Sequence, residues 1–203
     1  TPLAGYQEPH PVVFADAHPT TPTTYQELVS AVSKLRLSDS SLTAQPVHST
    51  ALGPGLRLGF LGLFHLDITQ ERLNREHQID LLFTSPTVQY QIILNSGRTL
   101  AVNHPQDLPD PSQIRQVLEP MVQVTLLTPA AYLGPLMQIL EHHRGIYQTT
   151  TYFADQSQLI YHLPLSELIS GLIDAVKSAS QGYASLDYLP LDPQPVDIVR
   201  LDI

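Results

Sequence analysis

The chain has 203 residues, of which 42% are hydrophobic and 14% charged, so it is long enough for one large or two small domains with cores of their own. Its formal net charge of −9 excludes strong non-specific attraction to the phosphate backbone of a nucleic acid. The absence of cysteine excludes disulfides, thiolate metal sites and a cysteine nucleophile.

The sequence shows neither a membrane-spanning run nor a signal-peptide pattern. No apolar run approaches the roughly 20 residues of a membrane-spanning helix, and the N-terminus lacks the charged and then apolar layout of a signal peptide. The sequence does not begin with methionine, and it ends inside a strand-like pattern, Val199 to Ile203. We therefore interpret it as a fragment.

The first 94 residues predict elements in the order strand, helix, strand, strand, helix, strand. Thr24 and Glu27 have the spacing of a capping box at the start of the first helix. From Leu63 the apolar residues recur at helical spacing, which predicts the second helix. The expected positions are a strand at 11–17, a helix from 24, strands at 41–50 and 56–60, a helix from 63, and a last strand in two pieces at 79–83 and 88–94.

The same order returns after a proline-rich stretch. Residues 95–120 hold four prolines and little apolar periodicity, and we predict a connector there. Gly145 suits the left-handed position after the next helix, and Gly182 ends the last one. The expected positions are a strand at 121–127, a helix from 133, strands at 146–153 and 159–163, a helix at 165–176, and strand segments at 183–189 and 198–203, with prolines between those two segments.

The repeated order predicts an α+β fold with two ferredoxin-like (βαββαβ) domains joined by a proline-rich connector. In such a domain both helices cover one face of a four-stranded antiparallel sheet. The predicted bounds are 11–94 for the first domain, 95–120 for the connector and 121–203 for the second domain.

The stretch RLGFLGLFHLDITQERL, residues 57–73, joins a predicted strand to a predicted helix. Gly59 and Gly62 would let the backbone turn steeply and let the two elements approach closely. His65 lies among apolar residues, where a hydrogen-bonded structural histidine is commoner than a ligand or a base. We predict that Gly59, Gly62 and His65 form a structural junction. A hydrolase that uses His65 with a nearby carboxylate is an alternative.

The sequence predicts no metal site. His142 and His143 are adjacent, so their side chains lie about 100° apart around a helix and cannot share a metal without other ligands. Asp107, Asp110 and Asp155 lack the spacing of a calcium loop.

Several separated motifs resemble LepA-type elongation factors, the ribosomal back-translocase group of translational GTPases, and more distantly elongation factor G. The similar segments cover nearly the whole chain in the order and spacing of that family. They are 5–8 and 11–15 at the entry into domain III, 55–90 within domain III, 108–111 in the connector between domains, and 128–134, 144–145 and 182–188 in domain V.

The resemblance implies a position within a longer protein. Residues 1–10 would be the tail of a preceding β-barrel domain, and residues 11–94 would correspond to domain III of elongation factor G. Residues 121–203 would correspond to domain V, truncated before a C-terminal domain. The implied function is a ribosome-docking and coupling fragment of a GTP-dependent translation factor that promotes back-translocation or fidelity of protein synthesis.

The chemistry implied for the parent protein, GTP hydrolysis on the ribosome, is not expected of this chain. It contains no GxxxxGK[ST] loop, whose backbone amides, lysine and hydroxyl hold the nucleotide phosphates and Mg²⁺. We therefore predict no catalytic residue and no cofactor in the fragment, whereas the parent protein would bind GTP and Mg²⁺.

The resemblance also implies where ribosomal RNA would be contacted. The candidates lie at helix ends of the domain V-like region: Arg144 with Gly145, and Lys177 with Gly182 and Tyr183. Relatives carry a basic K-S-R-S-R-G run where this chain has KSASQG at 177–182, so two positive charges are missing. Residues 121–203 hold three basic and eight acidic residues, a formal charge of −5, which favours protein or single-phosphate contacts over broad RNA contact.

The implied partners are the RNA and proteins of the large ribosomal subunit, and transfer RNA through the missing C-terminal domain. The parent would be a monomer with no transmembrane segment and possible peripheral membrane association. The lost basic residues favour a mitochondrial counterpart, in the matrix or on the matrix face of the inner membrane, with the chloroplast stroma or bacterial cytoplasm as alternatives. A stand-alone α+β module that binds a small molecule between its domains is the alternative function.

Overall fold

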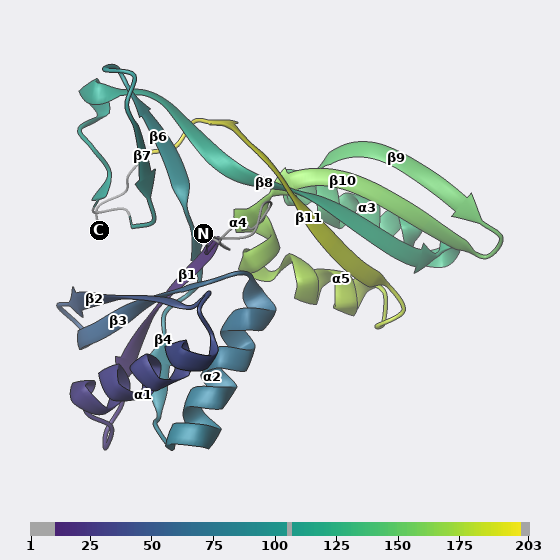
Figure 1. The fold of residues 1–203 in the computed structure, drawn as a ribbon. Helices are drawn as coiled ribbons and strands as arrows, with labels where there is room; N and C mark the ends of the chain where they lie inside the picture. The colour runs from purple at the N-terminus through teal and green to yellow at the C-terminus, as the bar shows by residue number, and fades with distance from the viewer. Residues whose placement is uncertain (1–10, 105–106, 200–203) are drawn as a thin grey trace, which may run out of the picture. The chain divides into compact units, whose positions relative to one another are not determined.

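The computed structural model describes residues 11–104 and 107–199, and the chain divides into two compact units between Thr87 and Val88 (Figure 1). The predicted barrel tail, residues 1–10, lies outside the described residues. Each unit consists of an antiparallel sheet with helices, so the predicted α+β class with two ferredoxin-like domains is confirmed. In the part of the chain that the structure describes, no helix is long and apolar enough to cross a membrane.

Unit 1 has the strand order β2-β3-β1-β4, and every pairing along that path is antiparallel. This is the order that βαββαβ connections produce when each helix crosses the same face of the sheet. A two-residue strand, β5, also pairs with β1. The elements are β1 (Val13–Pro19), α1 (Tyr25–Ser38), β2 (Thr43–Ser49), β3 (Gly53–Phe60), α2 (Leu63–His77), β4 (Leu81–Phe83) and β5 (Thr87–Val88).

Helix α1 begins where the sequence predicts it. The Thr24 hydroxyl accepts a hydrogen bond from the Glu27 N–H at 3.3 Å, and the Glu27 carboxylate accepts one from the Thr24 N–H at 2.7 Å. This reciprocal pair satisfies N–H groups that have no partner within the helix. The helix then buries an apolar stripe against β1 and β3, and the buried residues are Leu28, Ala31, Val32 and Leu35.

Unit 2 contains a second sheet of the same kind. Its strand order β11-β8-β10-β9 follows from the same βαββαβ connections, and all three pairings are antiparallel. Helices cover one face, where the alternate residues Val122, Val124 and Leu126 of β8 are buried. The elements are β6 (Tyr90–Leu94), β7 (Thr99–Val102), β8 (Ile114–Pro129), α3 (Leu133–His142), β9 (Ile146–Phe153), β10 (Gln156–Pro164), α4 (Leu165–Glu167), α5 (Ile173–Ala179) and β11 (Ser185–Val196), with 3-10 turns at Pro111–Gln113 and Ala130–Tyr132 and a π-helical turn at Leu168–Leu172.

The predicted connector at residues 95–120 is wrong, because β7 and the first part of β8 lie within it and belong to the sheet of unit 2. Strand β8 begins at Ile114, and its first part pairs with β6, which also pairs with β7. A small apolar cluster holds these strands together, with Ile92, Val102 and Val117 buried at its centre. Strand β6 therefore belongs to unit 2, and the division of the chain falls before it instead of after residue 94. The sequence pattern did not predict these strands, because prolines nearby are typical of loops and weaken the pattern by which strands are recognised.

The last strand also differs from the prediction. Residues 183–189 and 198–203 were expected as separate segments, but β11 is continuous from Ser185 to Val196 and includes Pro190, Pro193 and Pro195. Among the described strands it pairs only with β8, and its register shifts between Leu191 and Gln194. Proline is tolerated there because an edge strand needs hydrogen bonds along one side only. Residues 200–203 lie outside the described part of the chain.

The predicted helix at 165–176 is interrupted. The structure has a short helix α4, a π-helical turn at 168–172 and then α5, with Gly171 at a φ of 108°. Glycine accepts this positive φ without the steric penalty of a Cβ atom. The apolar stripe still packs inward, and Leu168, Leu172 and Val176 are buried.

Candidate functional site

The His65 imidazole connects the start of α2 to the end of α1. Its Nδ1 accepts a hydrogen bond from the Leu61 N–H at 3.0 Å, so Nε2 carries the proton and donates to Asp39 at 2.8 Å. Gly62 precedes α2 without a side-chain cap, and His65 reaches back as a capping-box residue would. The ring also meets Phe60 edge to face. Both ring nitrogens are occupied, so His65 has no free nitrogen to take a proton from a substrate, which argues against the hydrolase alternative.

Gly59 permits a close approach between strands. A Cβ atom at this position would lie 2.4 Å from Thr43 Oγ1 and 2.9 Å from atoms of Pro11 and Phe14. Thr43 is the partner of Gly59 on β2, and Phe14 is its partner on β1. Any side chain at residue 59 would therefore push against both neighbouring strands.

Asp39 gives this junction a pH dependence. Burial opposes its ionisation, but hydrogen bonds from Ser41 and His65 outweigh burial and lower the pKa of Asp39. A lowered carboxyl pKa stabilises the fold fully above the unfolded-state pKa, about 3.9, and this stabilisation is lost as the pH falls through the folded-state value. We expect Asp39→Asn to lower the free energy of unfolding by about 1 kcal/mol at pH 7 and by less at pH 3. Urea unfolding at the two pH values measures this, and Asp67→Asn, an exposed carboxylate of α2, should show no comparable loss.

Arg144, a predicted RNA contact, is bound within unit 2. Its guanidinium donates to both oxygens of Glu119, at 3.0 and 3.1 Å, and to Glu167 at 2.8 Å. The Glu119 side chain is only 7% exposed, and His143 Nδ1 lies 3.0 Å from the second Glu167 oxygen. Burial opposes ionisation of Glu167, but the hydrogen bonds from Arg144 and His143 outweigh it and lower the pKa of Glu167. Arg144 is therefore paired with two carboxylates of unit 2, and it links the end of α3 to β8 and α4.

Gly145 has a structural role next to this cluster. The left-handed residue after α3 is Arg144, with a φ of 55°, and not Gly145 as expected from the sequence. The Gly145 N–H donates to the Leu140 carbonyl at 2.8 Å, which closes the helix in a Schellman motif. A Cβ at Gly145 would lie 2.5 Å from that carbonyl oxygen, so glycine is required here by close approach.

The remaining predicted contacts form an exposed surface at the end of α5. Lys177 lies in the last turn of α5, and the Gly182 N–H donates to the Lys177 carbonyl at 2.9 Å. Gln181 and Gly182 both have positive φ, which turns the chain sharply before Tyr183. In the described part of the chain, the Lys177 ammonium has no side-chain hydrogen bond or ion pair.

Tyr183 stacks on Tyr132, a residue that the sequence did not single out. The two rings are nearly parallel, 13° apart with centroids 6.1 Å apart, and Tyr183 is 68% exposed. We call Tyr132, Lys177, Gly182 and Tyr183 the tyrosine–lysine surface. The predicted fold could have indicated that Tyr132 lies near Tyr183. The βαββαβ order brings the loop after the first strand and the loop before the last strand to one end of the sheet.

The structure separates the predicted contacts into two places. Arg144 is held at Glu119 of β8, whereas the tyrosine–lysine surface precedes Ser185, which pairs with Leu127 of the same strand. Eight residues of extended strand separate Glu119 from Leu127, about 26 Å. The two basic positions therefore do not form one continuous surface for a phosphate backbone.

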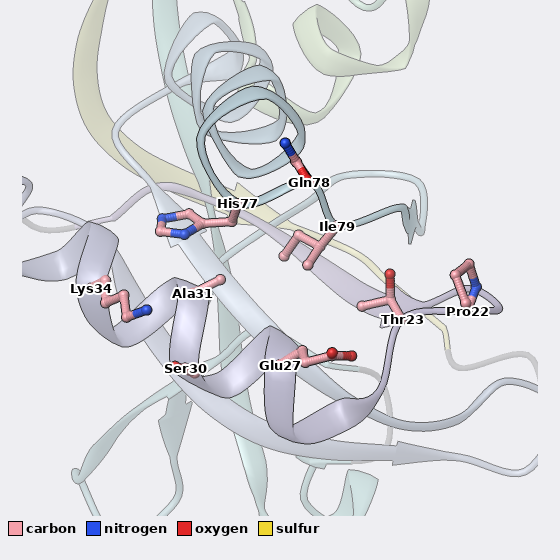
Figure 2. Close-up of a pocket in the computed structure, with 9 residues that line it drawn as sticks. All are labelled: Pro22, Thr23, Glu27, Ser30, Ala31, Lys34, His77, Gln78 and Ile79. Atoms are coloured by element: carbon pink, nitrogen blue, oxygen red, sulfur yellow. The ribbon is translucent and has the colours of Figure 1, made fainter.

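Unit 1 has a hollow of about 440 Å³, which is large enough for a small molecule (Figure 2). Its polar groups do not converge on one point, and the Glu27 carboxylate is already bound to Thr24. Among the residues that the structure describes, no three His, Asp or Glu side chains are grouped as a metal site. The hollow is lined by Pro22, Thr23, Glu27, Ser30, Ala31, Lys34, His77, Gln78 and Ile79.

Comparison with known proteins gives consistent matches. Residues 116–203 match the family described as elongation factor G C-terminus. Elongation factor 4 of Acetivibrio thermocellus is 45% identical over 203 residues, which are 100% of this chain and 34% of that protein. The chain is homologous to elongation factor 4 proteins over its whole length. Elongation factor 4 of Limosilactobacillus fermentum is 43% identical over 100% of the chain and 33% of that protein, and that of Lactococcus lactis subsp. cremoris is 44% identical over 99% and 33%.

The chain spans about a third of the length of these elongation factor 4 relatives. The relatives named here are bacterial, so they give no support to the predicted mitochondrial location. A crystal structure of ttk003000868 from Thermus thermophilus matches with a TM-score of 0.57 at 17% identity, and covers 94% of this chain and 42% of that one. At this identity the match supports the fold alone.

Proposed function

We propose that the chain is the ribosome-docking and coupling region of a GTP-dependent translation factor that promotes back-translocation or fidelity of protein synthesis. The supporting observation is its similarity, over its whole length, to elongation factor 4 proteins. Two α+β units with helix-covered sheets suit a stiff element between other domains. GTP and Mg²⁺ are held elsewhere in the whole protein, which acts as a monomer in the bacterial cytoplasm.

The tyrosine–lysine surface is the best candidate for contact with ribosomal RNA. It offers one unpaired cation and one exposed aromatic ring, which can contact a single phosphate and stack on an unpaired base. A formal charge of −5 over residues 121–203 disfavours a broader RNA interface. The open sheet face of unit 2 is a poorer candidate, because the central strands present mostly uncharged, non-aromatic side chains there, such as Gln123, Thr125 and Gln158. The His162 ring on that face lies 3.4 Å from the Gln123 side-chain oxygen.

We expect Lys177→Ala and Tyr183→Ala each to weaken binding of the whole protein to bacterial ribosomes by about fivefold or more, because each removes one local contact. Lys177→Ala should also lower the slope of log affinity against log salt by about one, as loss of a single phosphate contact requires. Co-sedimentation with ribosomes at several salt concentrations measures both effects.

Arg98→Ala is the matched control, because Arg98 is another exposed cation of unit 2, in the turn between β6 and β7. An equal loss of affinity in the control would show that net charge, and not the tyrosine–lysine surface, determines binding. Equal sedimentation of the unmodified protein with and without a non-hydrolysable GTP analogue would contradict GTP-dependent docking.

A further inference from the structure

The long edge strands of the two sheets differ in how they are protected from pairing. Strand β2 carries Pro46, and β11 carries three prolines together with Asp187 and Asp192. Proline and charged residues at an edge hinder the addition of a further strand. In the described part of the chain, β9 is the only edge strand longer than four residues that has neither proline nor a charged residue.

Strand β9, IYQTTTYF, pairs with β10 along one side, and no other strand that the structure describes pairs with its second side. Seven of its eight residues are exposed, and Tyr152 and Phe153 are 69% and 51% exposed. The first part of the edge is irregular, because the register shifts between Tyr147 and Thr149 and the Gln148 side chain donates to the Ile146 carbonyl at 3.1 Å. The open segment is Thr149 to Phe153.

The chemistry of this segment identifies the kind of partner. An edge strand directs alternate N–H and C=O groups outward, and another polypeptide backbone in extended form matches that spacing. Residues 145–154 contain no charged side chain, and Arg144 before them is held by Glu119 and Glu167. The segment has no cation to bind an RNA phosphate backbone. An uncharged peptide segment is a better match, because neither side of the contact would then bury an unpaired charge.

We propose that the β9 edge from Thr149 to Phe153 receives an extended, uncharged segment of a partner protein as an additional strand of the β11-β8-β10-β9 sheet. The added strand gains main-chain hydrogen bonds along Thr149–Thr151, and the exposed rings of Tyr152 and Phe153 provide apolar contacts for its side chains. This goes beyond the proposed function, because the site is on another element and takes protein instead of RNA.

The test uses the ¹⁵N-labelled chain and a synthetic octapeptide of alternating threonine and valine with a lysine at each end for solubility. Binding should shift the amide signals of Thr149 to Phe153 and slow the hydrogen exchange of the outward amides among them. The same peptide with every threonine and valine N-methylated should not bind, because neither of its edges can then donate main-chain hydrogen bonds.

Two variants separate the edge from the sheet face. Thr151→Lys places a charge on the edge and should weaken peptide binding about fivefold or more. Gln158→Lys is the control, because Gln158 is the partner of Thr151 on β10. A lysine at residue 158 places the same charge on the same face of the sheet, one strand further from the edge. The control should bind the peptide as the unmodified chain does, and both variants should keep the melting temperature.

Four results would overturn the proposal. They are no binding of the octapeptide, equal binding of the N-methylated peptide, signal shifts confined to other elements, and equal weakening by Gln158→Lys and Thr151→Lys. Self-association of the unmodified chain that Thr151→Lys abolishes would instead assign the edge to a second copy, which also contradicts a foreign partner. None of these measurements involves ribosomes, so failure here leaves the proposed ribosome docking untouched.

Discussion

Replacing Arg144 with alanine will lower the free energy of unfolding of the chain by about 2–3 kcal/mol at pH 7. The change leaves the buried Glu119 carboxylate without its two hydrogen bonds and removes the strongest partner of Glu167. Because the Arg144 side chain is 46% exposed, water compensates part of the loss, and the cost stays below that of a fully buried pair. Urea unfolding followed by circular dichroism measures the effect.

The control for this prediction is Lys177→Ala, which should leave the free energy of unfolding unchanged within about 0.5 kcal/mol, because Lys177 is exposed. The two variants should behave in opposite ways toward the ribosome. Below its melting temperature, Arg144→Ala should bind ribosomes as the unmodified protein does. A stable Arg144→Ala variant that loses ribosome affinity would instead support the RNA contact that the resemblance implies.

Replacing Arg57 with methionine should have a larger effect, about 3 kcal/mol or more. Arg57 Nε and Nη2 donate to the two oxygens of Asp16 at 2.7 and 2.9 Å, and the two side chains are only 9% and 15% exposed. Methionine keeps most of the length and apolar contact of the arginine stem, so the loss reports the unpaired Asp16 charge. Urea unfolding at pH 7 provides the measurement.

A second variant tests this explanation. Asp16→Leu combined with Arg57→Met removes both charges, and an apolar pair in place of a buried ion pair is often neutral in stability. The double variant should therefore recover most of the stability that Arg57→Met loses. If the double variant is as unstable as Arg57→Met, packing around Arg57 and not the unpaired charge is responsible.

Local patterns were sufficient for the elements that depend on neighbouring residues. Thr24 and Glu27 predicted the start of α1, because a capping box is complete within four residues. The apolar spacing from Leu63 predicted α2, and the exposed Glu71–Arg75 ion pair follows from the same spacing. The order of these elements predicted two ferredoxin-like sheets, because short connections leave few ways to arrange them.

The division of the chain depended on pairings between distant residues. Strand β6 joins β8 through Gln91 and Leu118, and no local signal distinguishes this partner from the strands of unit 1. The prolines of β11 indicate a loop in a local pattern, yet the edge position of β11 makes them compatible with a strand. Whether a strand lies at the edge or at the centre of a sheet depends on its pairing with strands that are distant in the sequence.

The candidate site also depends on contacts between residues that are distant in the sequence. The sequence by itself determined which residues are basic, the resemblance to a family and the absence of a nucleotide-binding loop from these 203 residues. Only the tertiary structure decided that Arg144 is bound to Glu119 and Glu167, whereas Lys177 remains available beside Tyr183. The physical reason is that the availability of a charge depends on which opposite charges the fold brings within hydrogen-bonding distance, and these partners lie more than twenty residues away along the chain.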